Sequence, residues 1–349
     1  MQVASVGRAF PPHYYHQGAL IDMFKGLWAT QQRNVQRLES LHRSALVRGR
    51  HLVLPIDAYS RPTSFTDAND TFIASAIELG EHAIRDGLDR AGLVPQDIDH
   101  LIFVSVTGVA TPSIDARLVN RLGLRTDVKR TPIFGLGCVA GAAGIARAAD
   151  YLRAFPEEVA VLLSVELCSL TLQRQDVSIS NIIASGLFGD GAAAAIMVGR
   201  GRVSDGPRVV ATRSVFYRDT ERIMGWDVTA DGFRIVLSAE VPKLIGTHLR
   251  ADVDQFLSDR GLSRSDIGSY VCHPGGPRVL EAVQQALDLD EAALAVTWES
   301  LKAVGNLSSA SVLMVLRDTM ETRRPPPGTY GLLIAMGPGF CAELILLQW

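Results

Sequence analysis

Two stretches of the sequence share one pattern: HAIRDGLDRAGLVPQDIDHLIFVS at residues 82–105 and ADVDQFLSDRGLSRSDIGSYVCHP at residues 251–274. Each reads as a helix, a Gly-Leu stop, an Asp-Ile pair and then a strand. Gly92 matches Gly261, 169 residues later, and a glycine at this place fits the left-handed position that ends a helix. The pattern predicts that an α/β unit occurs twice in the chain.

Two further matches have nearly the same spacing. Gly137-Cys138 precedes a segment of small residues that reads as a helix, and Gly305-Asn306 precedes a similar segment 168 residues later. The strand-like LLSVE at 162–166 matches LLIAM at 332–336, 170 residues later. Three similar offsets in one order predict two duplicated halves, residues 1–200 and 201–349, whose sheets have helices packed between and outside them.

Cys138 lies in FGLGCVAGAAG at residues 134–144, between an apolar run and a predicted helix at 145–155. A thiol at a helix N-terminus faces unpaired N–H groups and the positive end of the helix dipole, so we expect its pKa to be lowered. Glycines 135, 137, 141 and 144 predict a sharp turn that a substrate can approach closely. The alternative is a buried cysteine that acts only as a small hydrophobe.

The predicted symmetry brings sequence-distant residues together. It places the helix N-termini that carry Cys138 and Asn306 near one another at the middle of the fold. The strand that ends in CHPGG at 272–276 belongs to the second half and would deliver His273 to the same place. Cys138, His273 and Asn306 are therefore a plausible catalytic set.

Composition excludes several classes of protein. The chain has 349 residues, 47% of them hydrophobic, and a formal net charge of −3, which gives no broad basic surface for nucleic acid or an anionic membrane. No run approaches 18 apolar residues, so we expect no membrane span, and a cytoplasmic protein is the simplest interpretation. Four cysteines without CxxC spacing predict reduced thiols and no metal site.

These segments, together with LFGDGAA at 187–193 and MGPGF at 336–340, resemble the type III polyketide synthases of the chalcone synthase family, more closely its bacterial branch. The resemblance covers essentially the whole chain. It implies a duplicated thiolase-like fold with α-β-α-β-α layers, and an acyltransferase that uses CoA thioesters as substrates without a cofactor. It further implies that Cys138 is the acylated nucleophile, that His273 and Asn306 complete the triad, and that Phe188 is an aromatic gate.

The chemistry needs these groups. A thiolate attacks an acyl thioester, and an imidazolium on His273 would stabilise it as an ion pair. When malonyl-CoA loses carbon dioxide, donors from His273 and the Asn306 amide would stabilise the enolate oxygen. Simpler roles stay open: His273 could cap a loop, Asn306 could be a helix N-cap, and Phe188 could pack in the core.

The remaining candidate residues are assigned by resemblance. A basic patch should hold the phosphates of CoA, and Arg37 and Arg48 are its candidates, in a cluster with Arg43 and Arg50. Ser308 belongs to the Asn306 motif, and Gly337, Pro338 and Gly339 are expected to shape a cavity wall. In the plant enzymes the cavity wall has a second aromatic gate, and Ile235 occupies the corresponding position here. The plant wall also has three threonines. The corresponding residues here are Val106, Cys168 and Thr171, so only the third position keeps threonine.

This more apolar wall predicts an aliphatic acyl-CoA starter of medium to long chain, extended by malonyl-CoA to alkylpyrones or alkylresorcinols. One alternative is a synthase of the tetrahydroxynaphthalene or phloroglucinol type that uses malonyl-CoA alone. Others are an initiating ketoacyl synthase that takes an acyl carrier protein, a non-catalytic scaffold and a cysteine hydrolase. The resemblance also implies a homodimer, with a cis peptide at Thr111-Pro112 near the partner subunit.

Overall fold

The computed structural model describes residues 1–29, 36–61 and 63–349. Five strands come from the first part of the chain: β1 (Gln2–Ala9), β4 (His100–Ser105), β5 (Lys129–Phe134), β6 (Val159–Leu167) and β7 (Asp190–Val198). Four come from the second part: β8 (Arg208–Phe216), β11 (Ile267–Cys272), β12 (Tyr330–Gly337) and β13 (Cys341–Gln348). Within these described residues the nine strands have the order β11-β12-β13-β8-β1-β7-β6-β4-β5.

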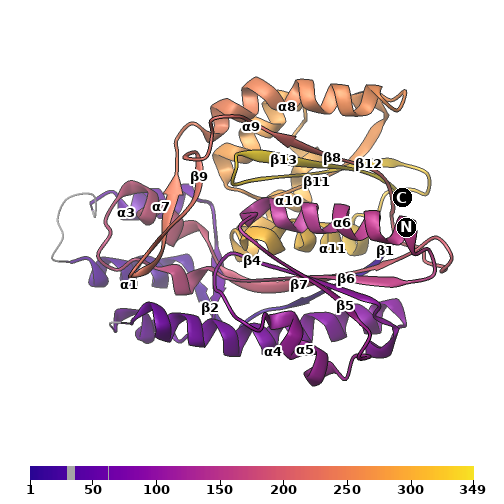
Figure 1. Ribbon diagram of the computed structural model, residues 1–349. Helices are drawn as coiled ribbons and strands as arrows, with labels where there is room; N and C mark the ends of the chain where they lie inside the picture. The colour runs from indigo at the N-terminus through magenta and orange to yellow at the C-terminus, as the bar shows by residue number, and fades with distance from the viewer. Residues whose placement is uncertain (30–35, 62) are drawn as a thin grey trace.

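The helices form three layers around two sheet regions (Figure 1). α4 (Phe65–Ala91) and α5 (Ile114–Leu122) cover one outer face, and α8 (Val241–Ser258) and α9 (Pro277–Leu287) cover the other. Between the sheet regions lie α6 (Ala140–Ala154) and α11 (Ser311–Thr322), with α10 (Ala295–Val304) beside them. The predicted α-β-α-β-α layering is therefore confirmed.

A smaller region extends from one side of the layers (Figure 1). It contains α1 (Gln17–Leu27), α3 (Leu38–Ser44), α7 (Ile179–Leu187) and two strand pairs, β2 (His13–His16) with β3 (Gly49–Leu52) and β9 (Met224–Thr229) with β10 (Gly232–Leu237). The short 3-10 helices are η1 (Ile56–Ser60), η2 (Pro95–Asp97), η3 (Gly137–Val139), η4 (Cys168–Thr171), η5 (Arg264–Asp266), η6 (Ala292–Leu294) and η7 (Ser308–Ala310).

The strand order confirms the internal repeat. β4-β6-β7-β1 and β11-β12-β13-β8 are successive neighbours in the same order, each with a parallel first pair and antiparallel later pairs. Gly92 and Gly261 both have left-handed backbones, with φ of 65° and 68°, as expected for the two helix ends. The two sheet regions meet where β1 and β8 pair at Gln2 and Arg208.

The middle layer is built for close helix packing. A Cβ on Gly141 of α6 would lie 2.3 Å from the Ser309 carbonyl oxygen, so only glycine permits this approach. The sequence predicted that this helix begins at residue 145, and this is wrong: α6 begins at Ala140. Gly141 and Gly144 therefore lie inside a buried helix. Their missing side chains allow neighbouring elements to pack closely, and they do not provide access for a substrate.

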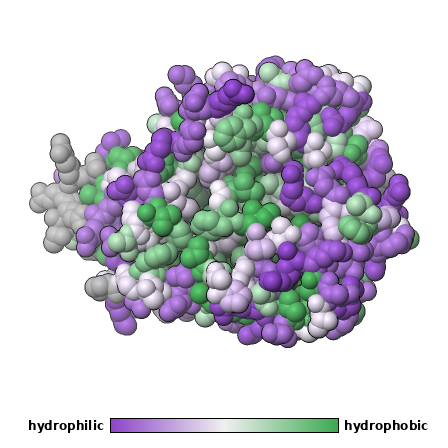
Figure 2. All heavy atoms as spheres, in the orientation of Figure 1, coloured by the Kyte–Doolittle hydropathy of each residue, from purple (hydrophilic) through white to green (hydrophobic). Residues whose placement is uncertain are grey.

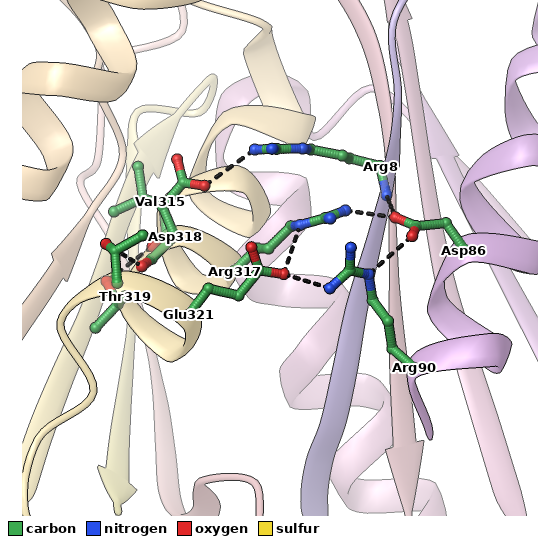
Figure 3. Close-up of polar contacts among 9 residues, drawn as sticks. Arg8, Asp86, Arg90, Val315, Arg317, Asp318, Thr319 and Glu321 are labelled. Carbon is green, nitrogen blue, oxygen red and sulfur yellow. Dashed lines mark hydrogen bonds and ion pairs between the residues drawn. The ribbon is translucent and has the colours of Figure 1, made fainter. Parts of the chain in front are cut away.

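A polar network joins the outer and middle layers (Figure 3). Asp86 of α4 accepts hydrogen bonds from the backbone N–H of Arg8 at 2.9 Å, from Arg90 at 2.8 Å and from Arg317 of α11. Glu321 of α11 also accepts from Arg90 and Arg317. The network fastens a helix of the first half to a helix of the second.

Most apolar side chains are enclosed between the layers. Every residue of β6 and β7 is buried, which explains their nearly continuous apolar sequences. Figure 2 shows that apolar side chains also reach the surface over the middle of one face, with hydrophilic ones toward its upper and right margins. Among the described residues, no helix combines the length and apolar character that a membrane crossing requires.

Candidate active site

Cys138 lies in the turn η3, between the end of β5 and the start of α6. The preceding Gly137 has a φ of 58°, a left-handed conformation that lets the chain turn into the helix. The thiol is buried, with 8% of the residue exposed, and its Sγ donates to the Ser308 hydroxyl oxygen over 3.6 Å. Cys138 therefore contacts the second half of the chain through Ser308.

His273 follows β11 directly, and backbone bonds fix its position. Its N–H donates to the Ile334 carbonyl at 2.8 Å, and its carbonyl accepts from the Gly275 N–H at 2.9 Å. The side chain is buried, yet neither ring nitrogen has a hydrogen-bond partner among the described residues. The backbone hydrogen bonds at the end of β11 therefore position the ring, and both ring nitrogens remain available to a substrate.

Asn306 is held by its backbone as well as its side chain. Its side-chain oxygen accepts from the Ser308 N–H at 2.8 Å, and its amide nitrogen donates to the Gly275 carbonyl at 3.3 Å. The first of these bonds resembles the alternative capping role, although α11 starts only at Ser311. The amide group also hydrogen-bonds to the Cys138 thiol, whose pKa this contact lowers.

Asn306 and Phe188 share a backbone bridge. The Asn306 N–H donates to the Leu187 carbonyl at 2.9 Å, and the Asn306 carbonyl accepts from the Gly189 N–H at 3.0 Å. The predicted gate is therefore attached directly to one of the predicted catalytic residues.

One cavity of about 760 Å³ brings most of the predicted residues together. Cys138, His273 and Asn306 all line it, from three separate parts of the chain. The other predicted residues in its wall are Ser308, Phe188, Cys168, Val106, Ile235, Pro338 and Arg37.

Four predicted residues are not part of this wall. The Thr171 hydroxyl donates to the Cys168 carbonyl at 2.8 Å and faces a smaller chamber. A Cβ on Gly337 would lie 2.6 Å from the Val139 N, so this glycine supports the nucleophile turn from behind. Gly339 lies beside Phe216. The exposed Arg48, directly before β3, pairs with Glu299 at 3.1 Å.

The electrostatics differ from the sequence prediction. Burial raises the pKa of the Cys138 thiol to about 12, with the nearby Glu166 carboxylate acting in the same direction. Burial also lowers the pKa of His273 to about 3. The expected thiolate is therefore not the resting form, because desolvation of the enclosed cavity outweighs the helix N-terminus and the Ser308 hydrogen bond. A neutral thiol and a neutral imidazole face the cavity near pH 7.

Sequence reasoning missed Glu166. This fully buried carboxylate accepts from the Val106 N–H at 3.1 Å, from the Thr107 hydroxyl at 2.9 Å and from the Ser309 hydroxyl. It thereby ties the end of β4 to the turn η7, which carries Ser308. The available signal was an acidic residue within the apolar strand β6.

Arg278 was missed as well. It is exposed in the first turn of α9 and lines the cavity together with Arg37, which precedes α3. Neither guanidinium has an ion-pair partner within the described part of the chain, and Glu281 is the acidic side chain that shares the described wall. The signal was a cation directly after the HPGGP motif at 273–277.

Comparison with known proteins gives concordant matches. The model of the N-terminal domain of chalcone and stilbene synthases matches residues 1–201, and that of the C-terminal domain matches residues 208–349. A 1,3,6,8-tetrahydroxynaphthalene synthase from Streptomyces peucetius subsp. caesius is 53% identical over 99% of this chain and 93% of its own length. A phloroglucinol synthase from Pseudomonas fluorescens is 33% identical over 94% of this chain and 97% of its own.

The structural comparison gives the same picture. The crystal structure of 1,3,6,8-tetrahydroxynaphthalene synthase from Streptomyces coelicolor, described as a bacterial type III polyketide synthase, superposes with a TM-score of 0.95 and 33% sequence identity. The match covers 100% of this chain and 99% of that one, and it confirms the thiolase-like fold class predicted from the sequence.

Proposed function

Because the chain belongs to the chalcone and stilbene synthase family and is a type III polyketide synthase, we propose that it condenses malonyl-CoA alone and makes a tetrahydroxynaphthalene-type product. The observation that carries the catalytic part is the convergence of Cys138, His273 and Asn306 on one cavity. The 53% identical relative supports the choice of product.

Loading begins on Cys138. The thiol gives its proton to the free ring of His273, and the thiolate attacks the thioester carbonyl of malonyl-CoA. The new thioester forms on Cys138 and the CoA thiol leaves. Both residues are neutral at rest, so the proton transfer creates two opposite charges in one cavity, where burial penalises either charge alone.

Chain extension uses a second malonyl-CoA. Its carboxylate leaves as carbon dioxide, and negative charge develops on the thioester oxygen. An N–H of the Asn306 amide, which also contacts the Cys138 thiol, and an N–H of His273 are the proposed donors in the described cavity wall. A donor of this kind contributes about 3 to 4 kcal/mol to lowering a barrier. The enolate carbon then attacks the acyl group on Cys138 and extends the chain.

Arg37 and Arg278 are the proposed contacts for the phosphates of CoA. They stand at the exposed part of the cavity wall, on different elements, without competing ion pairs in the described residues. Arg48 is not part of this proposal, because its charge is neutralised by Glu299 away from the cavity.

An aliphatic starter is the second candidate. Val106 and Ile235 make part of the wall apolar, which favours alkylpyrone or alkylresorcinol products. The relatives, whose names give tetrahydroxynaphthalene and phloroglucinol as products, support the malonyl-only alternative better.

We also propose a homodimer. β5 is at the edge of the sheet formed by the described strands, so one side of its backbone is unpaired. Phe134 at its end is 54% exposed and Val109 is 42% exposed. An unpaired edge with apolar side chains favours association. Light scattering should give twice the mass of one chain, and the mass of a single chain would exclude the dimer.

The decisive test is the product. Purified enzyme is incubated with malonyl-CoA alone and with malonyl-CoA plus acyl-CoA starters of increasing chain length, and products are identified by mass spectrometry. We expect a tetrahydroxynaphthalene-type product from malonyl-CoA alone, abolished in Cys138→Ala. Products only in the presence of a fatty acyl-CoA would overturn the proposal in favour of the aliphatic starter.

A further inference from the structure

A second, smaller cavity lies behind the wall of the catalytic cavity. We call it the side chamber; it has a volume of about 40 Å³, enough for a carboxylate group or a few water molecules. It shares four lining residues with the catalytic cavity: Cys168, Phe188, Trp226 and Ile235. These four side chains therefore form part of the boundary between the two spaces.

Arg50 is the charged residue among those described around the side chamber. It is 1% exposed, and its Nη2 donates to the Ser185 carbonyl at 2.6 Å. Its Nε and Nη1 have no partner within the described residues. Burial lowers its pKa to about 10, so Arg50 keeps its charge at neutral pH. A buried cation with unpaired donors is costly unless something accepts from it.

The neighbouring acid does not satisfy these donors. Asp190 accepts from the Val53 N–H at 2.7 Å, from the Ser169 N–H at 2.8 Å and from the Ser169 hydroxyl. Burial raises the pKa of Asp190 to about 6, and its charge and that of Arg50 attract each other, but no hydrogen bond or ion pair joins the two side chains in the described structure.

The hydroxyls around the side chamber are engaged too. The Tyr59 hydroxyl bonds to Ser169, and that of Thr171 donates to the Cys168 carbonyl. Of the buried side-chain nitrogen and oxygen atoms in the described lining of the side chamber, those without a hydrogen-bond partner are Nε and Nη1 of Arg50.

Arg50 also lies close to the catalytic residues. A Cβ on Gly189 would lie 3.0 Å from its Cβ, and one on Gly305 would lie 3.5 Å from its Cδ. These glycines flank Phe188 and Asn306, so the arginine packs directly behind their backbone bridge. An anion that reached Arg50 would pass the gate residue on its way from Cys138.

We propose that the side chamber is an anion subsite, in which Arg50 binds the carboxylate at the far end of a chain started by malonyl. This inference rests on the proposed function. The starter passes from CoA to Cys138 with its carboxylate intact as the CoA thiol leaves, and each extender loses its own carboxylate as carbon dioxide. The retained carboxylate moves away from Cys138 as the chain grows, and a guanidinium is the preferred partner for it. It leaves as carbon dioxide only when the finished chain closes to the tetrahydroxynaphthalene-type product.

The test compares chains with and without this carboxylate. Native enzyme and Arg50→Met are given malonyl-CoA alone or acetyl-CoA with malonyl-CoA, and the extended chains on Cys138 are measured by intact-protein mass spectrometry. We expect Arg50→Met to lower the malonyl-started chains at least tenfold relative to the acetyl-started ones. Arg50→Lys keeps the charge and should lose less than threefold. Arg85→Met, which removes an exposed arginine from α4, is the matched control.

Two further measurements keep the test decisive if Arg50→Met does not fold. Ala184→Leu fills the side chamber with Arg50 in place, because Ala184 lines this chamber and not the catalytic cavity, and it should change the ratio in the same direction. Crystals soaked in bromide should show an anomalous peak beside Nε or Nη1 of Arg50 in the native enzyme.

The two proposals can fail separately. If the native enzyme makes no malonyl-started chain, the proposed function fails, and the bromide peak still reports on the anion site. If malonyl-started chains form but their ratio is unchanged in both variants, or if only water occupies the side chamber, the inference is overturned.

Discussion

Cys138 and His273 show how burial sets the starting point of the reaction. Each side chain is enclosed, and burial shifts each pKa toward the neutral form. A thiolate must therefore be made by proton transfer within the pair when a substrate is present. The neutral thiol should therefore react slowly with electrophiles other than the substrate.

This arrangement predicts how the thiol of Cys138 reacts with iodoacetamide. Only the thiolate reacts, and a pKa of about 12 makes it a small fraction that grows about tenfold per pH unit. The alkylation rate should rise from pH 7 to pH 10 without a plateau, and the modification should be absent in Cys138→Ala. A plateau below pH 8 would show instead that the site stabilises a thiolate at rest.

Arg37 and Arg278 predict a binding effect separate from catalysis. Both are exposed at the cavity and neither belongs to the triad, so their loss should weaken the attraction of CoA phosphates. Replacing either by alanine should raise the KM for malonyl-CoA several-fold with kcat nearly unchanged, and added salt should reduce the difference. An unchanged KM in both variants would place the CoA phosphates elsewhere.

The sequence predicted which residues meet at the cavity better than which residues support its wall. Cys138, His273 and Asn306 were predicted to meet because repeat symmetry and motifs are local signals. Arg50 was grouped only with a basic patch, because nothing in its neighbourhood shows that β3 buries it. The neutral state of the thiol could not be predicted, because desolvation depends on the whole cavity.

Helices α6 and α11 are the elements that bring the two halves together, and their spacing depends on Gly141. The sequence assigned this glycine to a loop, since glycine usually interrupts helices. Its role is visible only when the partner helix is present, because the Ser309 carbonyl occupies the place of a side chain.

Gly141→Ala should therefore destabilise the protein. The new methyl group would overlap Ser309 and Val312, and overpacking of this kind costs about 1 to 3 kcal/mol in the free energy of unfolding. The matched control is Gly246→Ala in α8, where a Cβ would meet no atom within 4 Å. This substitution should raise the free energy of unfolding by about 0.5 to 1 kcal/mol. Urea unfolding measures both, and equal effects of the two substitutions would contradict this account.

At the scale of the whole molecule, the repeat predicted the layers and their order, since pseudo-symmetric offsets survive along the chain. It could not predict where the halves differ. β5 has no counterpart in the described second half, where α10 lies instead between α9 and α11. Such a difference leaves no trace in the matching segments, which come from shared elements only.

Acid should destabilise the fold through buried histidines, of which His42 is an example. Burial and the charge of Arg50 lower its pKa to about 3, whereas the unfolded value is 6.5. The unfolded state therefore binds more protons below pH 6.5, and stability is complete above this pH and is lost as the pH falls toward 3. The loss has a limiting slope of about 1.4 kcal/mol per pH unit for one group.

The measurement is a difference between two proteins. Unfolding free energies of the native chain and of His42→Gln are compared between pH 7.5 and pH 5.5, so that other titrating groups such as Asp190 cancel. The native chain should lose more stability on acidification than the variant. Parallel pH profiles would show that His42 does not titrate with unfolding.

The bridge between Phe188 and Asn306 has a consequence for how this enzyme can change over generations. A mutation that shifts the backbone at Phe188 also displaces the Asn306 amide, which the proposed chemistry uses, so new substrates gained in this way would come with slower turnover. Ile235 and Trp226 belong to the hairpin of β9 and β10, whose strands pair only with each other in the described structure. Their side chains can vary in size while the triad stays in place, and the hairpin is therefore the easier route by which descendants of this protein acquire different products.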